Sequence, residues 1–303
     1  MNIQTLAQTL RIAPPVGAAN LTMYPLLADV EKPAGYLTLD ESLAAGFVKV
    51  TEVSEAGHVP ELTIVNDGPT PVLVLDGEEL VGAKQNRIVN LTILVPARRT
   101  LRLPVSCVEA GRWSRRSHAF AAAGRTHYAS GRAMKVEQVS SCLRTSGGRH
   151  ADQSAIWADI DAKSARMAAT SPTHAAAEMY RRARGALDDF QAGLEPLPCQ
   201  VGAIFAINGV IAGLELFDSP ATWRKSMRKI VESYGLDAVD RQEEAPRRAP
   251  DDPGRFLSSV STAEVESFPA IGLGTDLRFK SGGTTGAALA VDDELVHLLA
   301  FAS

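Results

Sequence analysis

The sequence predicts an α+β protein with an antiparallel, β-rich first half and a second half of mixed helices and hairpins. Short runs rich in Val, Ile, Leu and Thr, separated by Gly, Pro, Asn and Asp, fill the chain up to about residue 109. Apolar residues at helical spacing begin near residue 152. Further on, two strand-like runs flank Asn208-Gly209, a pair typical of a tight hairpin turn. We expect the first half to form a sandwich-like antiparallel sheet.

Length, charge and cysteine content restrict the class of protein. The chain has 303 residues, enough for about two domains or one large mixed domain, and its net charge is −4. That charge argues against nucleic-acid binding by the chain as a whole. Three cysteines are too few, and odd in number, for a disulfide framework. The sequence begins without the regions of a signal peptide and has no run of about 18 apolar residues, so we expect a cytoplasmic protein without membrane contact.

The first half is expected to consist of short strands and one helix. The helix begins at Thr38, which Glu41 can help to cap, and ends at Gly46. The expected strands are residues 47–53, 62–66, 71–75, 87–95 and 100–107. We assign residues 1–111 to this β-rich region.

A basic segment follows at residues 112–150, and we expect it to be a Gly- and Ser-rich loop. Only Glu137 opposes its eight cations. These cations are Arg112, Arg115, Arg116, Arg125, Arg132, Lys135, Arg144 and Arg149. The segment can be a solvated, mobile loop, a flap over an anionic ligand, or an RNA-binding stretch whose affinity falls steeply with salt.

Residues 151–303 are expected to form a mixed α+β region, which can also be integrated with the first half into one domain. Apolar stripes predict helices at 152–167 and 173–192, and a third from Ser219-Pro220 to Gly235. A charged, proline-containing linker spans 240–255. After it we expect a helix from Phe256 and strands near 271–279, 287–291 and 295–301. His297 in the last strand is expected to be a core histidine, with an acid or base role as the alternative.

The densest polar motif occupies residues 76–87 and leads directly into an apolar strand. A tight turn then joins this strand to the next one, which predicts an antiparallel pair. Counted from Val95 opposite Arg99, Arg87 lies opposite Cys107. Gln85 then faces Glu109, so two polar runs meet at one end of a sheet. A one-residue slip or a β-bulge would turn one run to the other face.

The residue types in these runs suit an anionic ligand. Lys84 and Arg87 can hold phosphate, and Gln85 and Asn86 can bind hydroxyl or amide edges. The expected ligand-binding residues are Lys84, Gln85, Asn86, Arg87, Arg112 and Trp113. The expected catalytic residues are Glu78, Glu79 or Glu109 as general base, and Cys107 as a nucleophile.

Each of these assignments has a structural alternative. A guanidinium beside an apolar face needs a carboxylate, so the whole cluster can be a structural network. Cys107 can be a small buried hydrophobe, and Trp113 can lie in the core. The sequence contains no Walker, GxGxxG, HExxH or GxSxG motif and no zinc-ligand spacing, so it indicates no metal and identifies no cofactor.

Several blocks resemble one prokaryotic domain family, named for its association with ADP-ribosylglycohydrolases and rhodanese-like phosphatases. The blocks cover most of the chain: DGEELVGAKQNRI, TILVPA, LPVSCVEAGRW, QSAIW, GAIFAINGVIAGLELFDSP, SYGLDAV and VHLLAF. The resemblance implies a gene-neighbourhood link to NAD-derived nucleotide or ADP-ribose metabolism, in conflict or stress systems, and it transfers no residue role. The matching polar positions are Glu78, Glu79, Lys84, Gln85, Asn86, Arg87, Cys107, Glu109, Arg112 and Trp113.

We therefore expect a protein that binds an ADP-ribose-like or other phosphorylated nucleotide. If it is an enzyme, we expect a hydrolase or transferase acting on that nucleotide. The alternative is a non-enzymatic interaction module, whose polar cluster is structural and whose helices at 152–191 and 219–238 present a partner surface. The sequence leaves the substrate and the oligomeric state open.

Overall fold

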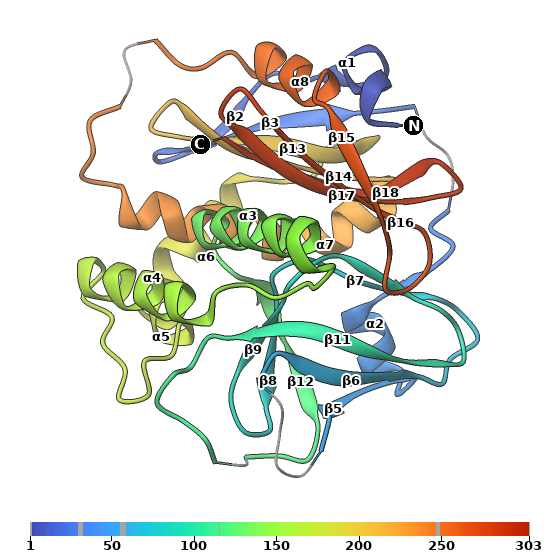
Figure 1. The fold of residues 1–303 in the computed structure, drawn as a ribbon. Helices are drawn as coiled ribbons and strands as arrows, with labels where there is room; N and C mark the ends of the chain where they lie inside the picture. The colour runs from blue at the N-terminus through green and yellow to red at the C-terminus, as the bar shows by residue number, and fades with distance from the viewer. Residues whose placement is uncertain (1, 30–32, 55–58, 115, 247–248, 303) are drawn as a thin grey trace.

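The structure, a computed structural model, describes residues 2–29, 33–54, 59–114, 116–246 and 249–302. Figure 1 shows a large antiparallel sheet at the top, a layer of helices in the middle and a small β-barrel at the bottom. The predicted α+β class, with its β-rich first half, is confirmed. None of the helices in the described ranges is long and apolar enough to cross a bilayer.

The barrel is built from one continuous part of the chain. Its strands close in the order β11-β6-β5-β12-β8-β9. They are β5 (Val48–Glu52), β6 (Glu61–Asn66), β8 (Glu78–Gly82), β9 (Arg87–Val89), β11 (Arg99–Cys107) and β12 (Phe120–Thr126). Buried aliphatic side chains such as Val50, Leu62, Ile64 and Leu103 fill its core. These six strands thus close on themselves, so the barrel has no unpaired edge.

A small sheet lies beside the barrel, in the order β10-β7-β4. Its strands are β4 (Leu37–Thr38), β7 (Val72–Val74) and β10 (Ile93–Val95). Helix α2 (Leu39–Ala44) follows β4 directly and carries the expected capping box, in which Thr38 and Glu41 each bind the other's backbone N–H.

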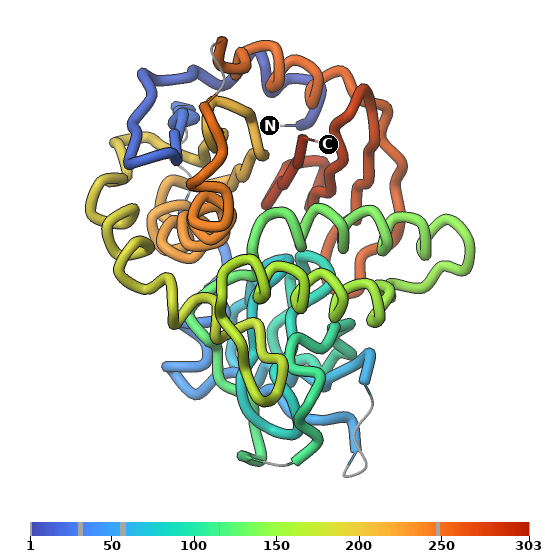
Figure 2. The backbone as a smooth tube through the Cα atoms, turned by 90° about the vertical axis from the view of Figure 1, so that its left-hand side faces the viewer, coloured from blue at the N-terminus to red at the C-terminus, as the bar shows by residue number. Residues whose placement is uncertain are grey.

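The large sheet combines strands from both parts of the chain. Its order is β1-β3-β13-β14-β18-β17-β16-β15, and β2 also pairs with β3. The bounds are β1 (Arg11–Ile12), β2 (Val16–Ala18), β3 (Leu21–Leu27), β13 (Gln200–Ile207), β14 (Val210–Phe217), β15 (Val265–Pro269), β16 (Thr275–Ser281), β17 (Thr284–Val291) and β18 (Glu294–Ala302). The hairpin at Asn208-Gly209 is confirmed, with φ angles of 53° and 78° at the turn. Both chain ends lie at this sheet in both views (Figures 1 and 2).

Helices cover both faces of the large sheet. The short η1 (Ile3–Thr5), α1 (Leu6–Thr9) and α8 (Pro253–Ser261) pack on the outer face. The middle layer consists of α3 (Ala129–Ser146), α4 (Gln153–Arg166), α5 (Ala177–Arg182), α6 (Arg184–Gly193) and α7 (Pro220–Asp240). Helix α7 contacts β13 of the sheet and β12 of the barrel, so it joins the two β structures.

Two helix predictions differ from the structure in detail. The helix expected to end at Gly235 continues to Asp240, and Gly235 serves a packing role instead. A Cβ at this glycine would lie 3.0 Å from both Leu187 and Phe190 of α6, so its absence lets the two helices approach closely. The single helix expected at 173–192 is divided into α5 and α6.

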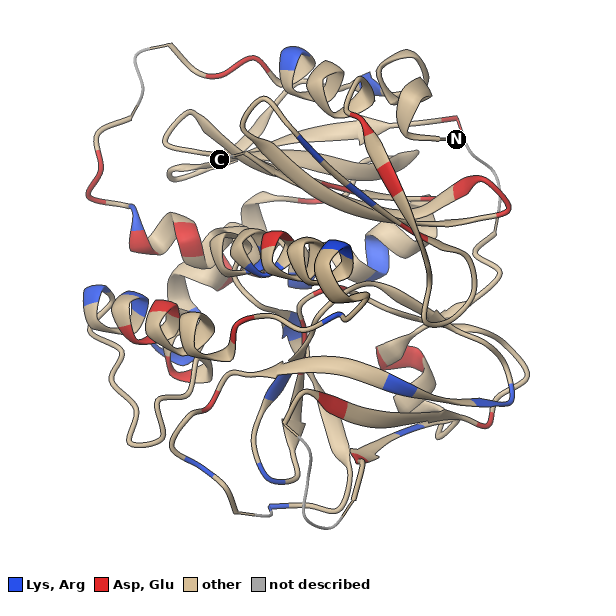
Figure 3. Ribbon diagram, in the orientation of Figure 1, with Lys and Arg blue, Asp and Glu red and all other residues tan. Residues whose placement is uncertain are grey.

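The loop expected at 112–150 is wrong for much of its length. Strand β12 closes the barrel beyond the boundary expected at residue 111, and α3 follows it. The reason is that cations of this segment are interior ion-pair partners rather than solvated charges: Arg132 and Lys135 are fully buried. Charges of both signs occur within the middle layer (Figure 3). Arg115 lies outside the described residues, as do residues 247–248 of the expected linker.

Candidate functional site

The predicted pairing of the two polar runs is confirmed at the end of the strands that carries Arg87 and Cys107. Strand β9 pairs with β11, and Arg87 lies opposite Cys107. The pair from which the register is counted does not form, because Arg99 pairs with Asn66 of β6 and Val95 belongs to the small sheet. The long strand expected at 87–95 therefore splits, and its first part keeps the predicted register.

Gln85 is the centre of the hydrogen bonds that hold these runs together. Its Oε1 accepts from Nη1 of Arg87 at 2.8 Å and from Sγ of Cys107 at 2.9 Å. Its Nε2 donates to the backbone oxygen of Glu109 at 3.0 Å. The amide thus joins the β8–β9 loop to the end of β11, and the expected proximity of Gln85 and Glu109 is present.

Glu109 and Arg112 form a buried ion pair at the same place. Glu109 accepts from Nε of Arg112 at 2.8 Å, from the backbone N–H of Asn86 at 3.2 Å and from the Thr173 hydroxyl at 3.0 Å. Burial alone would raise the pKa of Glu109, but these donors together hold it below its usual value. Arg112 also donates to the backbone oxygens of Ala83 and Ser114. Both side chains are therefore fully engaged.

Arg87 differs from Arg112 in having few partners. It has no exposed surface, and within the described part of the chain its Nε and Nη2 have no hydrogen-bond partner. Burial lowers its pKa. At the end of β5, Oε2 of Glu52 is likewise buried without a partner among the described residues, while its Oε1 accepts from the backbone N–H of Lys84 at 3.3 Å.

Trp113 covers this group of side chains from the solvent side. It is 50% exposed, so it is not a core residue. Nζ of Lys84 lies 5.2 Å from its ring centroid, and Cζ of Arg87 lies 5.8 Å from it. Both distances are within the range of cation–π attraction.

Cys107 is held as a protonated thiol. Burial raises its pKa to about 11, although the charge of Arg87 acts in the opposite direction. Gln153 at the start of α4 binds both backbone groups of Cys107, at 2.7 Å and 2.9 Å. We call Lys84, Gln85, Asn86, Arg87, Cys107, Glu109, Arg112 and Trp113, together with Glu52, the barrel-end cluster.

Compared with known protein families, residues 9–301 match the ARG and Rhodanese-Phosphatase-superfamily-associated Protein domain. The chain belongs to this family. No curated protein and no solved structure matches it. The match spans barrel, helix layer and large sheet, so all three are parts of the rhodanese-phosphatase-associated domain. The family is associated with ADP-ribosylglycohydrolases and the rhodanese-phosphatase superfamily.

In this member of the family, the structure places Glu78 and Glu79 away from the barrel-end cluster. Glu78 binds Nζ of Lys229 on α7 at 2.5 Å, and Glu79 binds Arg125 of β12 through two contacts of 2.6 Å and 3.0 Å. These two carboxylates therefore join β8 to α7 and to β12, and among the described residues neither forms a hydrogen bond or ion pair with Arg87.

Asp76, just before them, belongs to a buried interlayer network of Asp76, Thr92, Arg132, Lys135, Glu215 and His297. Arg132 pairs with Asp76 at 3.2 Å and with Glu215 at 2.7 Å. His297 is a core histidine, bound by Thr92 at 2.8 Å and Glu215 at 3.0 Å through its two ring nitrogens. The network links barrel, helix α3 and large sheet in the rhodanese-phosphatase-associated domain.

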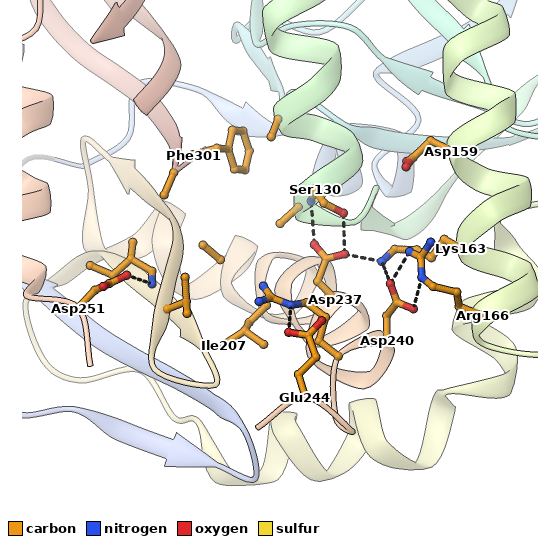
Figure 4. Close-up of a pocket in the computed structure, with 17 residues that line it drawn as sticks. Ser130, Asp159, Lys163, Arg166, Ile207, Asp237, Asp240, Glu244, Asp251 and Phe301 are labelled. Carbon is orange, nitrogen blue, oxygen red and sulfur yellow. Dashed lines mark hydrogen bonds and ion pairs between the residues drawn. The ribbon is translucent and has the colours of Figure 1, made fainter. Parts of the chain in front are cut away.

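A cavity of about 730 Å³ lies elsewhere, between the helix layer and the β13–β14 hairpin. Figure 4 shows its charged wall, where Lys163 bridges Asp237 and Asp240, and Arg166 also binds Asp240. Asp237 further accepts from the backbone and hydroxyl of Ser130. Among the lining residues, acidic side chains outnumber basic ones by five to three, and none of the expected site residues lines this cavity.

Reasoning from the sequence missed Glu52 of the barrel-end cluster and two residues that bind the cluster, Thr173 and Gln153. Glu52 and Thr173 carry no motif that marks them. Gln153 is the first residue of the QSAIW block, whose resemblance to the family was a usable signal. In the described ranges, no three His, Cys, Asp or Glu side chains are grouped as metal ligands.

Proposed function

We propose that this protein binds a phosphorylated nucleotide, such as an ADP-ribose-like ligand, at the barrel-end cluster. The observation that carries the proposal is Arg87, whose guanidinium is fully buried with two nitrogens unpartnered among the described residues. A buried donor without a partner costs about 1–3 kcal/mol. A ligand that supplies the missing acceptors would offset this cost.

Different residues of the barrel-end cluster bind different parts of the ligand. The charge of Lys84 attracts the phosphorylated part of the ligand, the two unpartnered nitrogens of Arg87 donate to acceptor atoms of the ligand, and Trp113 stacks on its base. Gln85 orients Arg87, while Glu109 and Arg112 fix the β8–β9 loop, which carries Lys84 and leads into Arg87. Because Arg87 has no exposed surface, binding requires Trp113, on the loop between β11 and β12, to move aside.

The protonation of Cys107 and the hydrogen bonds of Glu109 support ligand binding more directly than catalysis. Cys107 is protonated at neutral pH, and Glu109 is committed to three donors, so neither is poised as a nucleophile or base. Hydrolysis or transfer of the nucleotide stays a prediction. It is tested by incubating the protein with ADP-ribose and NAD and separating the products chromatographically.

Calorimetric titration of the full chain with ADP-ribose, NAD and ribose tests the proposal. We expect the nucleotides to bind, ribose alone to bind much more weakly, and Arg87→Met to abolish binding. Arg102→Met is the matched control, because Arg102 is an exposed arginine of the same barrel that contacts Thr63. Trp113 fluorescence should change on binding, and Trp113→Phe should remove that change. Absence of binding by ADP-ribose, NAD and every other nucleotide tested at millimolar concentration contradicts the proposal.

A second candidate is a protein-interaction module in which the cluster is purely structural. The buried Glu109–Arg112 pair favours it, since every polar atom of that pair serves the fold. It predicts that Glu109→Gln and Lys84→Met lower the melting temperature without changing any ligand response. RNA binding by residues 112–149 is disfavoured, because Arg132 and Lys135 are buried in the interlayer network.

A further inference from the structure

The barrel end that holds Arg87 also holds an acceptor from the opposite wall. Strands β5, β12, β8, β9 and β11 are neighbours in the barrel and pair antiparallel in turn. The end of β5, the start of β9 and the end of β11 therefore lie at one mouth. Glu52, Arg87 and Cys107 occupy these three positions, and Lys84 connects Glu52 to Trp113.

The unpartnered atoms of Arg87 have a defined geometry. Nε and Nη2 carry parallel N–H bonds on one edge of the planar guanidinium, which is the edge that binds two acceptors at once. Nη1, on the other edge, already donates to Gln85. A ligand group that satisfies Arg87 must therefore present two acceptor atoms side by side in one plane.

The carboxylate of Glu52 restricts the kind of ligand group that can bind Arg87. A phosphate or carboxylate offers two acceptors, but it would meet the carboxylate of Glu52 at the same mouth and be repelled. Oε2 of Glu52, buried and unpartnered among the described residues, needs a hydrogen-bond donor. The matching group is uncharged, with two acceptors on one edge and N–H donors on an adjacent edge.

We propose that the barrel mouth recognises a guanine base. Its O6 and N7 accept from Arg87, an N–H of its N1–N2 edge donates to Glu52, and Trp113 stacks on the ring. The phosphate of the nucleotide then lies at Lys84, outside the base. Adenine fits poorly, because its exocyclic amine would present a donor to the donors of Arg87. This inference rests on the proposed nucleotide site and narrows its ligand.

Calorimetric titration of the full chain with GMP, AMP and 7-deaza-GMP tests it. We expect GMP to bind about tenfold more tightly than AMP, as is typical of one bidentate contact. 7-Deaza-GMP lacks N7 and should lose most of that preference. Equal affinity for GMP, AMP and ADP-ribose overturns the guanine assignment and leaves the proposed function standing. Failure of every nucleotide to bind overturns both.

Glu52→Gln separates the role of the carboxylate from that of the fold. This variant should reduce the preference for GMP over AMP severalfold and increase the affinity for inorganic phosphate, because the repelling charge is gone. The control is Glu137→Gln on α3, where a surface carboxylate paired with Lys280 is removed far from the mouth. Unchanged GMP preference in Glu52→Gln, with an unchanged melting temperature, overturns the assignment.

Discussion

Arg87 and Arg112 offer a direct comparison between two buried arginines of one cluster. Among the described residues, the guanidinium of Arg87 makes a single hydrogen bond, to Gln85, whereas Arg112 binds Glu109, Asn86 and several backbone oxygens. We predict that Arg87→Met leaves the free energy of unfolding unchanged or raises it. We predict that Arg112→Met lowers it strongly.

The magnitude for Arg87 follows from its contacts. Removing two unpartnered donors relieves about 4 kcal/mol, at about 2 kcal/mol each. The variant loses one hydrogen bond to a charged donor, worth about 2 kcal/mol, and a cation–π contact with Trp113 of about 0.5–1 kcal/mol. Gln85 keeps the Cys107 thiol as a donor, so its Oε1 is not left unpartnered. Arg87 also attracts the carboxylates of Glu52 and Glu109, and this attraction is lost with the cation. The net expectation is therefore a change between zero and a gain of about 1 kcal/mol.

The loss for Arg112→Met has a different cause. It leaves the Glu109 carboxylate buried without its cation, and breaking one partner of a buried pair costs about 3–5 kcal/mol. Urea unfolding monitored by circular dichroism measures both variants against the wild type. If Arg87→Met proves as destabilising as Arg112→Met, Arg87 is a structural ion-pair partner, and the reasoning from its unpartnered nitrogens fails.

Three further predictions concern charge, thiol and backbone. Because the pKa of Glu109 is lowered on folding, its contribution to stability is present above about pH 4.3 and is lost as the pH falls through the folded pKa. Urea unfolding at pH 3–7 should therefore show a shallower acid loss for Glu109→Gln than for the wild type; equal slopes would contradict this. Cys107 should resist iodoacetamide at pH 8 while the two other cysteines react, as mass spectrometry can show, and its early alkylation would refute a raised pKa near 11. Gly77→Ala should lower the melting temperature more than Gly124→Ala, since both glycines have positive φ but only at Gly77 would Cβ lie 2.7 Å from Arg132; equal losses would mean that the side chain yields freely.

The sequence predicted the Arg87–Cys107 pair because the antiparallel register of two neighbouring strands follows from counting along the chain. Arg87 and Cys107 are opposite each other in the expected register, even though the strand between them and the turn splits. A local rule could not reveal that Glu52 reaches the same barrel mouth from the opposite wall. Nor could it separate Glu78 and Glu79 from the cluster, since their partners Lys229 and Arg125 are remote in sequence.

The misassigned segment at 112–150 has a related physical cause. Along the chain, Arg132 and Lys135 look like solvated charges in a polar stretch. In the fold they meet Asp76 and Glu215, from the barrel and the large sheet, and only these distant carboxylates make their burial possible. Ion pairs between layers leave no periodic pattern in a sequence, so the helix that carries them was not predicted.

The large sheet has a consequence for how the protein emerges from the ribosome. Strand β3 forms one of its interior positions, yet the neighbour β13 follows only at Gln200–Ile207, after the whole barrel and five helices, α2 to α6, have been translated. The barrel, by contrast, is complete once Thr126 has left the exit tunnel. Nascent chains should therefore form the closed barrel first, while β3 stays without its neighbour β13 until that strand has been translated.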